Sequence, residues 1–270
     1  MSGWVLIMVW CAGPDEHSLE LVRKDASAHE IAGLRAAQAV RPEATAVPEI
    51  VAWGTNWLII PLMPGTALDP DVGAVPANLF DALARLHARY DGGTDVPDRI
   101  PRVNHAWWSG LCRGWVDPQF QEHAARHPAD TIARARELVE LVADHPTAIA
   151  VLDQLTPTLL HGDVHAGNVL VDRERDRAAL IDWGSCRVGP AMLDLANLVT
   201  ADSTGVARYA DTWQRLTGQA LPNATVELGY RWAGLQIPVQ YLPWMIEHVP
   251  THDVEAALDR VEQALNRLAA

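Results

Sequence analysis

Two short motifs decide how this chain folds: His161-Gly162-Asp163-Val164-His165-Ala166-Gly167-Asn168-Val169-Leu170-Val171 and, shortly after it, Leu180-Ile181-Asp182-Trp183-Gly184. A carboxylate such as that of Asp163 can accept the proton of a hydroxyl group. Amide and carboxylate oxygens, as in Asn168 and Asp182, are hard ligands that suit Mg²⁺. A loop that turns tightly at its glycines can bring the first two of these side chains to one cavity. The motifs therefore predict a proton acceptor beside a magnesium site.

The residues between the two motifs predict a β-hairpin. Residues 168–171 form an apolar run, residues 172–177 are a charged turn, and residues 178–181 return as a second strand. This hairpin would place Asp182 next to Asn168. Taken singly, Asp163 could instead be a helix cap or a turn residue, and Asn168 a turn residue in a left-handed conformation.

Taken together, and followed by Gly189-Pro190 and Asp194-Leu195-Ala196, the motifs resemble those of the aminoglycoside phosphotransferase (choline-kinase-like) family, which has a protein-kinase-like fold. The resemblance implies an ATP-dependent phosphotransferase in which Asp163 is the catalytic aspartate. It also implies that Asn168 and Asp182 bind Mg²⁺. The resemblance extends over most of the chain but is specific only between about residues 160 and 196, so it does not name the acceptor.

Two other polar residues of this region have structural interpretations. His161 and His165 are four residues apart, as zinc ligands on a helix would be, but the glycines and the following strand argue against a helix here. The resemblance implies instead that His161 is a structural residue of the loop. We expect Asp194 to be a buried hydrogen-bonding residue.

The N-terminal part predicts a strand hairpin followed by one helix. Residues 4–11 and 18–24 are β-rich and are separated by Gly-Pro-Asp turn chemistry. A capping box then begins at Ser27 and ends at Glu30, and it starts a helix that runs to about Ala39. This order matches the small lobe of the kinase-like fold.

In kinases, a lysine on the strand before this helix reaches the ATP phosphates and a glutamate of the helix holds it. Lys24 is the single lysine among 21 basic residues, and we assign it to the phosphates with Glu30 as its partner. Arg23 is the alternative, because strand alternation would turn it inward with the leucines at 19 and 21. Glu30 could also serve only the helix terminus.

The segment at residues 57–65 resembles the passage between the two lobes of the family. This alignment gives adenine the carbonyl of Pro61 and the N–H of Met63, with Ile60 behind them. The alternative is a buried edge strand. The sequence contains no Gly-x-Gly-x-x-Gly phosphate loop. We therefore expect the phosphates to be covered by the turn at residues 12–14, or to be held mainly by Lys24 and Mg²⁺.

The whole pattern predicts an α+β, two-lobed fold. Residues 1–65 would form a small antiparallel β lobe with one helix, together with the linker, and residues 66–270 a larger, mostly helical lobe for catalysis and acceptor binding. Apolar periodicity predicts helices at 78–88, 129–144, 205–217, 224–247 and 252–269. Most of the tryptophans of the large lobe should pack in its core.

Composition bounds the partners. With 270 residues, 49% of them hydrophobic, the chain can bury a substantial core. Its three cysteines without paired spacing fit reduced thiols, and no apolar run approaches a membrane span, so we expect a cytoplasmic protein that forms a monomer or a weak dimer. The net charge of −13, of which residues 66–270 supply the larger part, argues against nucleic acid or an anionic membrane as partner.

The same charge is compatible with a cationic acceptor. The leading interpretation is a kinase that uses ATP, or GTP as the alternative nucleotide, with Mg²⁺, and phosphorylates a hydroxyl of a cationic antibiotic such as an aminoglycoside or a basic cyclic peptide. The alternatives are a metabolic kinase for an amino alcohol, sugar or homoserine-like acceptor, and an inactive kinase-like binding module. Four carboxylates of the large lobe are candidates for contacting a cationic group: Asp202, Glu227, Glu247 and Asp253.

Overall fold

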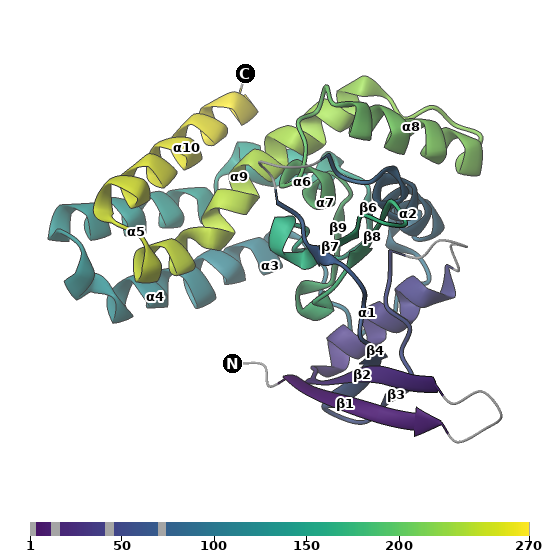
Figure 1. Cartoon of the computed structure of the whole chain (residues 1–270). Helices are drawn as coiled ribbons and strands as arrows, with labels where there is room; N and C mark the ends of the chain where they lie inside the picture. The colour runs from purple at the N-terminus through teal and green to yellow at the C-terminus, as the bar shows by residue number, and fades with distance from the viewer. Residues whose placement is uncertain (1–3, 12–16, 41–45, 70–73, 270) are drawn as a thin grey trace.

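The computed structural model describes residues 4–11, 17–40, 46–69 and 74–269, and these form two lobes (Figure 1). The small lobe contains an antiparallel sheet of order β1-β2-β4-β3, built from β1 (Trp4–Cys11), β2 (His17–Asp25), β3 (Ala52–Trp53) and β4 (Trp57–Pro61). The predicted opening hairpin is confirmed, with Trp4 opposite Lys24 at one end of the β1–β2 ladder and Cys11 opposite His17 at the other. The turn at residues 12–14, proposed as a phosphate cover, lies outside the described residues.

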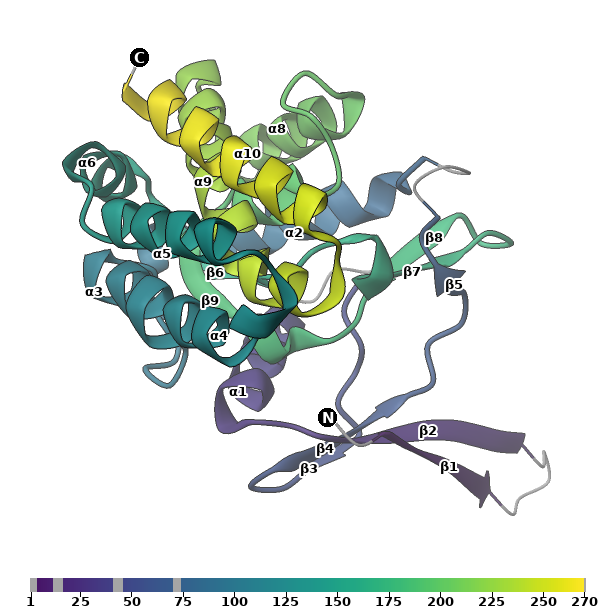
Figure 2. The same ribbon diagram turned by 90° about the vertical axis from the view of Figure 1, so that its left-hand side faces the viewer.

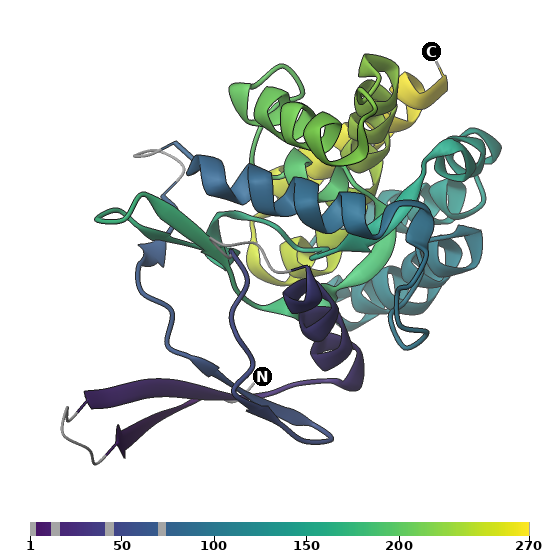
Figure 3. The same ribbon diagram turned by 90° about the vertical axis from the view of Figure 1, so that its right-hand side faces the viewer.

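The helix of the small lobe, α1 (Ala28–Ala39), begins at the predicted capping box. The Ser27 side chain accepts a hydrogen bond from the Glu30 backbone N–H, which satisfies one of the free donors of the helix N-terminus. Although it precedes the linker in sequence, α1 packs against the large lobe (Figure 3). The Tyr90 hydroxyl donates to the Ala36 carbonyl (2.9 Å), and the Cys186 thiol donates to the His29 carbonyl (3.2 Å).

Two small sheets frame the two motifs. The predicted hairpin is confirmed as β7 (Val169–Asp172) and β8 (Arg177–Leu180), and β5 (Thr66–Ala67) adds a third strand beside β7. The first motif follows β6 (Pro157–Leu160), which pairs with β9 (Arg187–Pro190). Both motifs are therefore held at strand ends, close to the junction of the lobes.

Helices make up the rest of the large lobe (Figure 2). All five helices predicted there are confirmed to within one residue at each end: α2 (Ala77–Arg89), α5 (Ala129–Ala143), α8 (Thr204–Thr217), α9 (Asn223–His248) and α10 (Thr251–Ala269). The shorter α3 (His105–Gly110), α4 (Asp117–Glu122), α6 (Pro146–Gln154) and α7 (Leu193–Ala196) were not predicted, and a π-helical turn at Leu111–Val116 joins α3 to α4. Single 3₁₀ turns lie at Asp91–Gly93, Ala124–Arg126, Ala166–Asn168 and Trp183–Ser185.

The buried side chains form two clusters. One extends across the lobe junction and includes Leu34 of α1, Leu83 of α2 and Leu180 of β8. The other lies among the helices of the large lobe, where Trp108 and Trp232 meet edge to face with ring centroids 5.2 Å apart. Several tryptophans are thus core residues, as expected. In the described part of the chain no helix is both long and apolar enough to span a membrane.

Candidate active site

The first motif is a tight loop whose backbone is held by hydrogen bonds to the Asp194 side chain. Gly162 has φ = 84°, and a Cβ at this position would collide with the Ser185 carbonyl oxygen, so the loop needs glycine here. The two carboxylate oxygens of Asp194 accept the backbone N–H groups of His161 and Gly162, each at 2.8 Å. Asp194 is completely buried, which confirms the expectation that it is a buried hydrogen-bonding residue.

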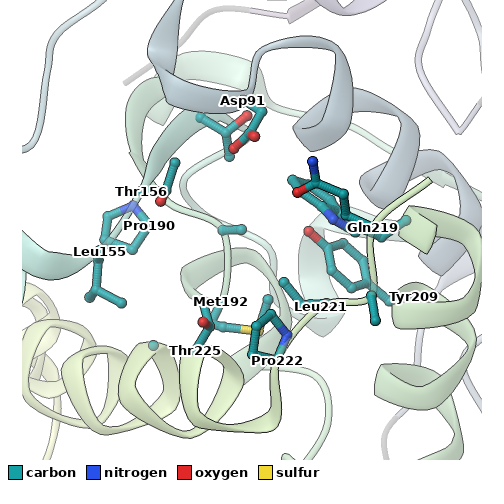
Figure 4. Close-up of a pocket in the computed structure, with 15 residues that line it drawn as sticks. Asp91, Leu155, Thr156, Pro190, Met192, Tyr209, Gln219, Leu221, Pro222 and Thr225 are labelled. Atoms are coloured by element: carbon teal, nitrogen blue, oxygen red, sulfur yellow. The ribbon is translucent and has the colours of Figure 1, made fainter. Parts of the chain in front are cut away.

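Two further buried side chains support Asp194. The Nε2 atom of His87 lies 3.2 Å from Asp194, and its Nδ1 atom lies 3.0 Å from the Tyr209 hydroxyl. Burial opposes ionisation of Asp194, but hydrogen bonds from His87 and from the Gly162 N–H outweigh it and lower the pKa of the carboxyl group. Tyr209 also lines a cavity of about 170 Å³ on the far side of this network, together with Asp91 and Gln219 (Figure 4). The lining of that cavity includes none of the predicted site residues.

Asp163 projects from the loop with its carboxylate only partly covered. Its Oδ1 atom accepts a hydrogen bond from the Tyr241 hydroxyl at 2.5 Å. The amide nitrogen of Asn168 donates to the backbone carbonyl of Asp163 at 2.9 Å and lies 3.3 Å from its Oδ2 atom. The side chain of Asp163 is 25% exposed, so the Oδ2 side can receive a proton from a bound molecule.

Asn168 and Asp182 lie at the open end of the β7–β8 hairpin, opposite its turn. The Ile181 N–H donates to the Asn168 carbonyl at 3.0 Å, which places the two motifs side by side. Because the amide nitrogen of Asn168 binds Asp163, its oxygen is the atom left for a cation. Asp182 adopts a left-handed conformation, with φ = 62° and ψ = 71°, which directs its carboxylate toward the small lobe.

Lys24 joins the two lobes at this point. Its ammonium group donates to Glu30 at 2.6 Å and to Asp182 at 2.5 Å. Burial by itself would raise the pKa of the Asp182 carboxyl group, but the hydrogen bond from Lys24 and the lysine charge lower it. The lysine side chain is 4% exposed, whereas that of Arg23 is 39% exposed and lies 3.4 Å from Asp25. Lys24 rather than Arg23 therefore points toward α1 and Asp182.

The backbone groups of the linker that are predicted to contact adenine point away from strand β2. The Leu62 N–H donates to the Glu20 carbonyl across the β2–β4 ladder. Because successive residues of a strand direct their backbone groups to opposite sides, the Pro61 carbonyl and the Met63 N–H face away from β2. Ile60, one residue earlier, is buried. This orientation is compatible with the predicted adenine contacts, which stay a prediction.

The four carboxylates considered for a cationic acceptor are dispersed. Asp202 and Glu227 line a cavity between α8 and α9, Glu247 lines another at the end of α9, and Asp253 lies beside His252 on α10. The structure does not bring them together around Asp163.

Sequence reasoning missed two side chains that touch the loop. Tyr241 lies 78 residues after Asp163 and could not be connected with it from sequence. Arg187 is buried, donates to the Gly162 carbonyl and to Gln240 (2.8 Å), and has its guanidinium 5.2 Å from the Trp107 ring centroid. Burial lowers the pKa of this guanidinium. One signal was available for Arg187, because it lies three residues after the second motif, at the start of β9.

Comparison with known proteins agrees with this geometry. The sequence model of the phosphotransferase enzyme family, APH, matches residues 17–228. The comparison with curated proteins finds no match. Among solved structures, the choline kinase from Cryptosporidium parvum Iowa II superposes with a TM-score of 0.65 at 10% identity, covering 98% of this chain and 90% of that one.

Two antibiotic-modifying enzymes have similar folds. The ADP-bound aminoglycoside phosphotransferase APH(2'')-Ib has a TM-score of 0.54 at 15% identity, covering 96% and 92% of the two chains. The macrolide 2'-phosphotransferase MphH from Brachybacterium faecium has a TM-score of 0.50 at 19% identity, covering 96% and 93%.

The fold and the site define a phosphotransferase with a kinase-like, two-lobed architecture and an alcohol group as acceptor. The chain belongs to the phosphotransferase enzyme family whose model it matches over most of its length.

Proposed function

We propose that this protein transfers the γ-phosphoryl group of ATP to a hydroxyl group of a small molecule, with Asp163 as the catalytic base. The observation that carries the proposal is the convergence of Lys24, Asp163, Asn168 and Asp182 from three separate segments at the junction of the lobes. Positioning and charge stabilisation are most of what phosphoryl transfer needs from a protein.

In the proposed reaction, the acceptor hydroxyl gives its proton to the Oδ2 atom of Asp163 as its oxygen bonds to the γ-phosphorus. The bond between the γ-phosphorus and the oxygen that bridges to the β-phosphorus breaks, and that oxygen leaves with ADP. The products are ADP, a phosphate monoester and one proton. Tyr241 holds the other carboxylate oxygen, so Asp163 presents a fixed orientation to the acceptor.

The donor set fits Mg²⁺. Asn168 offers an amide oxygen and Asp182 a carboxylate, and Mg²⁺ is commonly held by one or two such groups together with substrate phosphates. When bound, the cation neutralises charge on the phosphates. Lys24, fixed by Glu30, supplies a second positive charge, and the backbone of Pro61 and Met63 suits adenine, or guanine if GTP is the donor.

The acceptor class has two candidates. The acidity of the large lobe favours a cationic antibiotic, such as an aminoglycoside or a basic cyclic peptide, and an aminoglycoside phosphotransferase and a macrolide 2'-phosphotransferase are among the similar structures. A metabolic acceptor is the second candidate, and a choline kinase is among the similar structures. A binding module without activity is disfavoured, because it would have no need of Asp163, Asn168 and Asp182 together.

A screen of ATP consumption tests the proposal. The panel contains aminoglycosides, basic cyclic peptides, macrolides, amino alcohols, sugars and hydroxy acids, each assayed with the wild type and with Asp163→Asn. We expect one class to be phosphorylated, and turnover to fall about 10²–10⁴-fold in Asp163→Asn while ATP binding is retained. Turnover of the variant within a factor of two of the wild type would rule out the role of Asp163.

A further inference from the structure

A cavity of about 440 Å³ opens beside the proposed catalytic base. Its walls come from α9, α10 and the end of α7, and Tyr241, whose hydroxyl binds Asp163, is one of its lining residues. The remaining lining residues include Asn197, Tyr230 and Met245. Its volume falls within the range of small-molecule sites, and Tyr241 connects it with Asp163.

The charged residues that line this cavity are basic. They are Arg260 and Arg267, and none of the described lining residues is an aspartate or a glutamate. Within the described part of the chain, neither arginine has a hydrogen bond or an ion pair. The acidic residues nearest to them on α10 are engaged elsewhere, because Arg134 of α5 binds both Asp259 (2.6 Å) and Glu262 (2.9 Å). The cavity is therefore positive although the lobe as a whole is acidic.

Arg260 and Arg267 are spaced so that both could contact one elongated molecule. They are seven residues apart on a helix, which separates them by about 10 Å along its axis. Gly234 also lines the cavity and leaves space there, since a Cβ added to it would have no described atom within 4 Å. Glycine in a helix interior costs about 0.5–1 kcal/mol relative to alanine. Helix stability therefore does not explain why a glycine stands at position 234.

We propose that the acceptor carries a carboxylate or phosphate group, held by Arg260 or Arg267, while its hydroxyl is presented to Asp163. The proposal rests on the phosphotransferase activity proposed above, and it replaces the cationic antibiotic as acceptor with a hydroxyl compound that bears an anion, because the charge next to Tyr241 is positive although the lobe as a whole is acidic. Arginine suits this role because its planar guanidinium binds both kinds of anion through paired hydrogen bonds. The apolar side chains of Ile237 and Met245 would cover the uncharged part of the acceptor.

Matched acceptors test the charge. N-benzoylhomoserine is compared with its methyl ester, and glycerol 3-phosphate with glycerol, so that each pair keeps the hydroxyl and differs in the anion. We expect phosphorylation of at least one anionic member, with kcat/KM about 10–100-fold above its neutral partner and a KM that rises with salt. The two pairs distinguish a carboxylate from a phosphate.

Variants test the residues. Arg260→Gln and Arg267→Gln should reduce the preference for the anionic acceptor, whereas Arg231→Gln should not, because Arg231 is exposed like the other two arginines but lies outside the lining of the cavity. Gly234→Leu should obstruct the cavity and raise the KM for the acceptor without changing the Kd for ATP. Gly110→Leu is its control, since Gly110 is also an exposed helical glycine with nothing described within 4 Å.

The outcomes separate the two proposals. Equal use of both members of each pair, preference for amine-bearing acceptors, or unchanged selectivity in both arginine variants would overturn the anionic acceptor while leaving phosphoryl transfer intact. Absence of turnover with every acceptor would instead contradict the proposed activity. In that case calorimetric titration with N-benzoylhomoserine decides: binding that is lost in Arg260→Gln or Arg267→Gln supports the anion site, and no binding to the wild type refutes it.

Discussion

Replacing Asp194 by Asn should destabilise the protein and slow its reaction, although the Asp194 side chain is completely buried. Each carboxylate oxygen of Asp194 accepts one backbone N–H of the loop that carries Asp163, at 2.8 Å, and His87 lies 3.2 Å from one of these oxygens. An asparagine offers only one acceptor oxygen, so in either orientation its NH₂ group faces a buried N–H of His161 or Gly162. The substitution therefore leaves at least one buried donor without a partner and removes the charge.

The magnitude follows from these contacts. An unsatisfied buried donor costs about 1–3 kcal/mol, and the loss of a charge-assisted bond adds to this, so we expect a loss of about 2–4 kcal/mol. In a protein of this size that corresponds to a fall in Tm of roughly 5–10 °C. Because the pKa of Asp194 is lowered in the folded state, its contribution is present at neutral pH and is lost as the pH falls through the folded pKa, so the difference between variant and wild type should shrink in acid.

Thermal unfolding and steady-state kinetics measure both effects. Asp202→Asn is the control, since Asp202 is an exposed carboxylate that accepts only a local bond from Thr200 (2.7 Å), and we expect its Tm to change by less than about 2 °C. The loop carries Asp163, so kcat of Asp194→Asn should fall more than the affinity for ATP. A Tm of Asp194→Asn within about 1 °C of that of the wild type would refute the reasoning.

Two further predictions concern the nucleotide site. Lys24→Ala should strongly weaken ATP binding or slow phosphoryl transfer, whereas Arg23→Ala should change either one little, because Lys24 and not Arg23 faces Glu30 and Asp182. Kinetics at saturating acceptor measure both variants. A larger loss of activity for Arg23→Ala would assign the phosphate-binding cation to Arg23. Asp182→Ala should reduce Mg²⁺-dependent ATP binding more than Asn168→Ala, because it removes a charged ligand; unchanged Mg·ATP affinity of Asp182→Ala in calorimetry would contradict the metal assignment.

The sequence predicted those parts of the fold that local patterns determine. The N-cap bond of Ser27 and the apolar periodicity of the long helices depend on residues a few positions apart, and these elements formed as predicted, although the Glu30 side chain binds Lys24 and does not complete a capping box. The region around Trp107 and Trp115 was harder, because aromatic residues and glycines there obscure any helical period, and it folds into short α and π turns.

The site was predictable only where its residues are neighbours in sequence. Asn168 and Asp182 meet through one hairpin, which sequence can anticipate, but Tyr241 reaches Asp163 from a helix 78 residues later. The orientation of Lys24 also needed the structure. β2 lies between β1 and β4, and an inner strand can be covered on both faces, so alternation with neighbouring leucines did not identify the face that meets α1.

The attachment of α1 to the large lobe has a consequence for motion. Gly33 is so close to Cys186 that a Cβ on it would overlap the thiol, and His29 lies 2.8 Å from the carbonyl of Gly184, the last residue of the second motif. Sliding or rotation of α1 would break these contacts together. If the lobes open and close, the hinges should therefore lie in the chain on either side of the small sheet, and Glu30 should stay with the large lobe while Lys24 moves. The ion pair between them would then act as a latch, sensing whether the sheet is closed over the site.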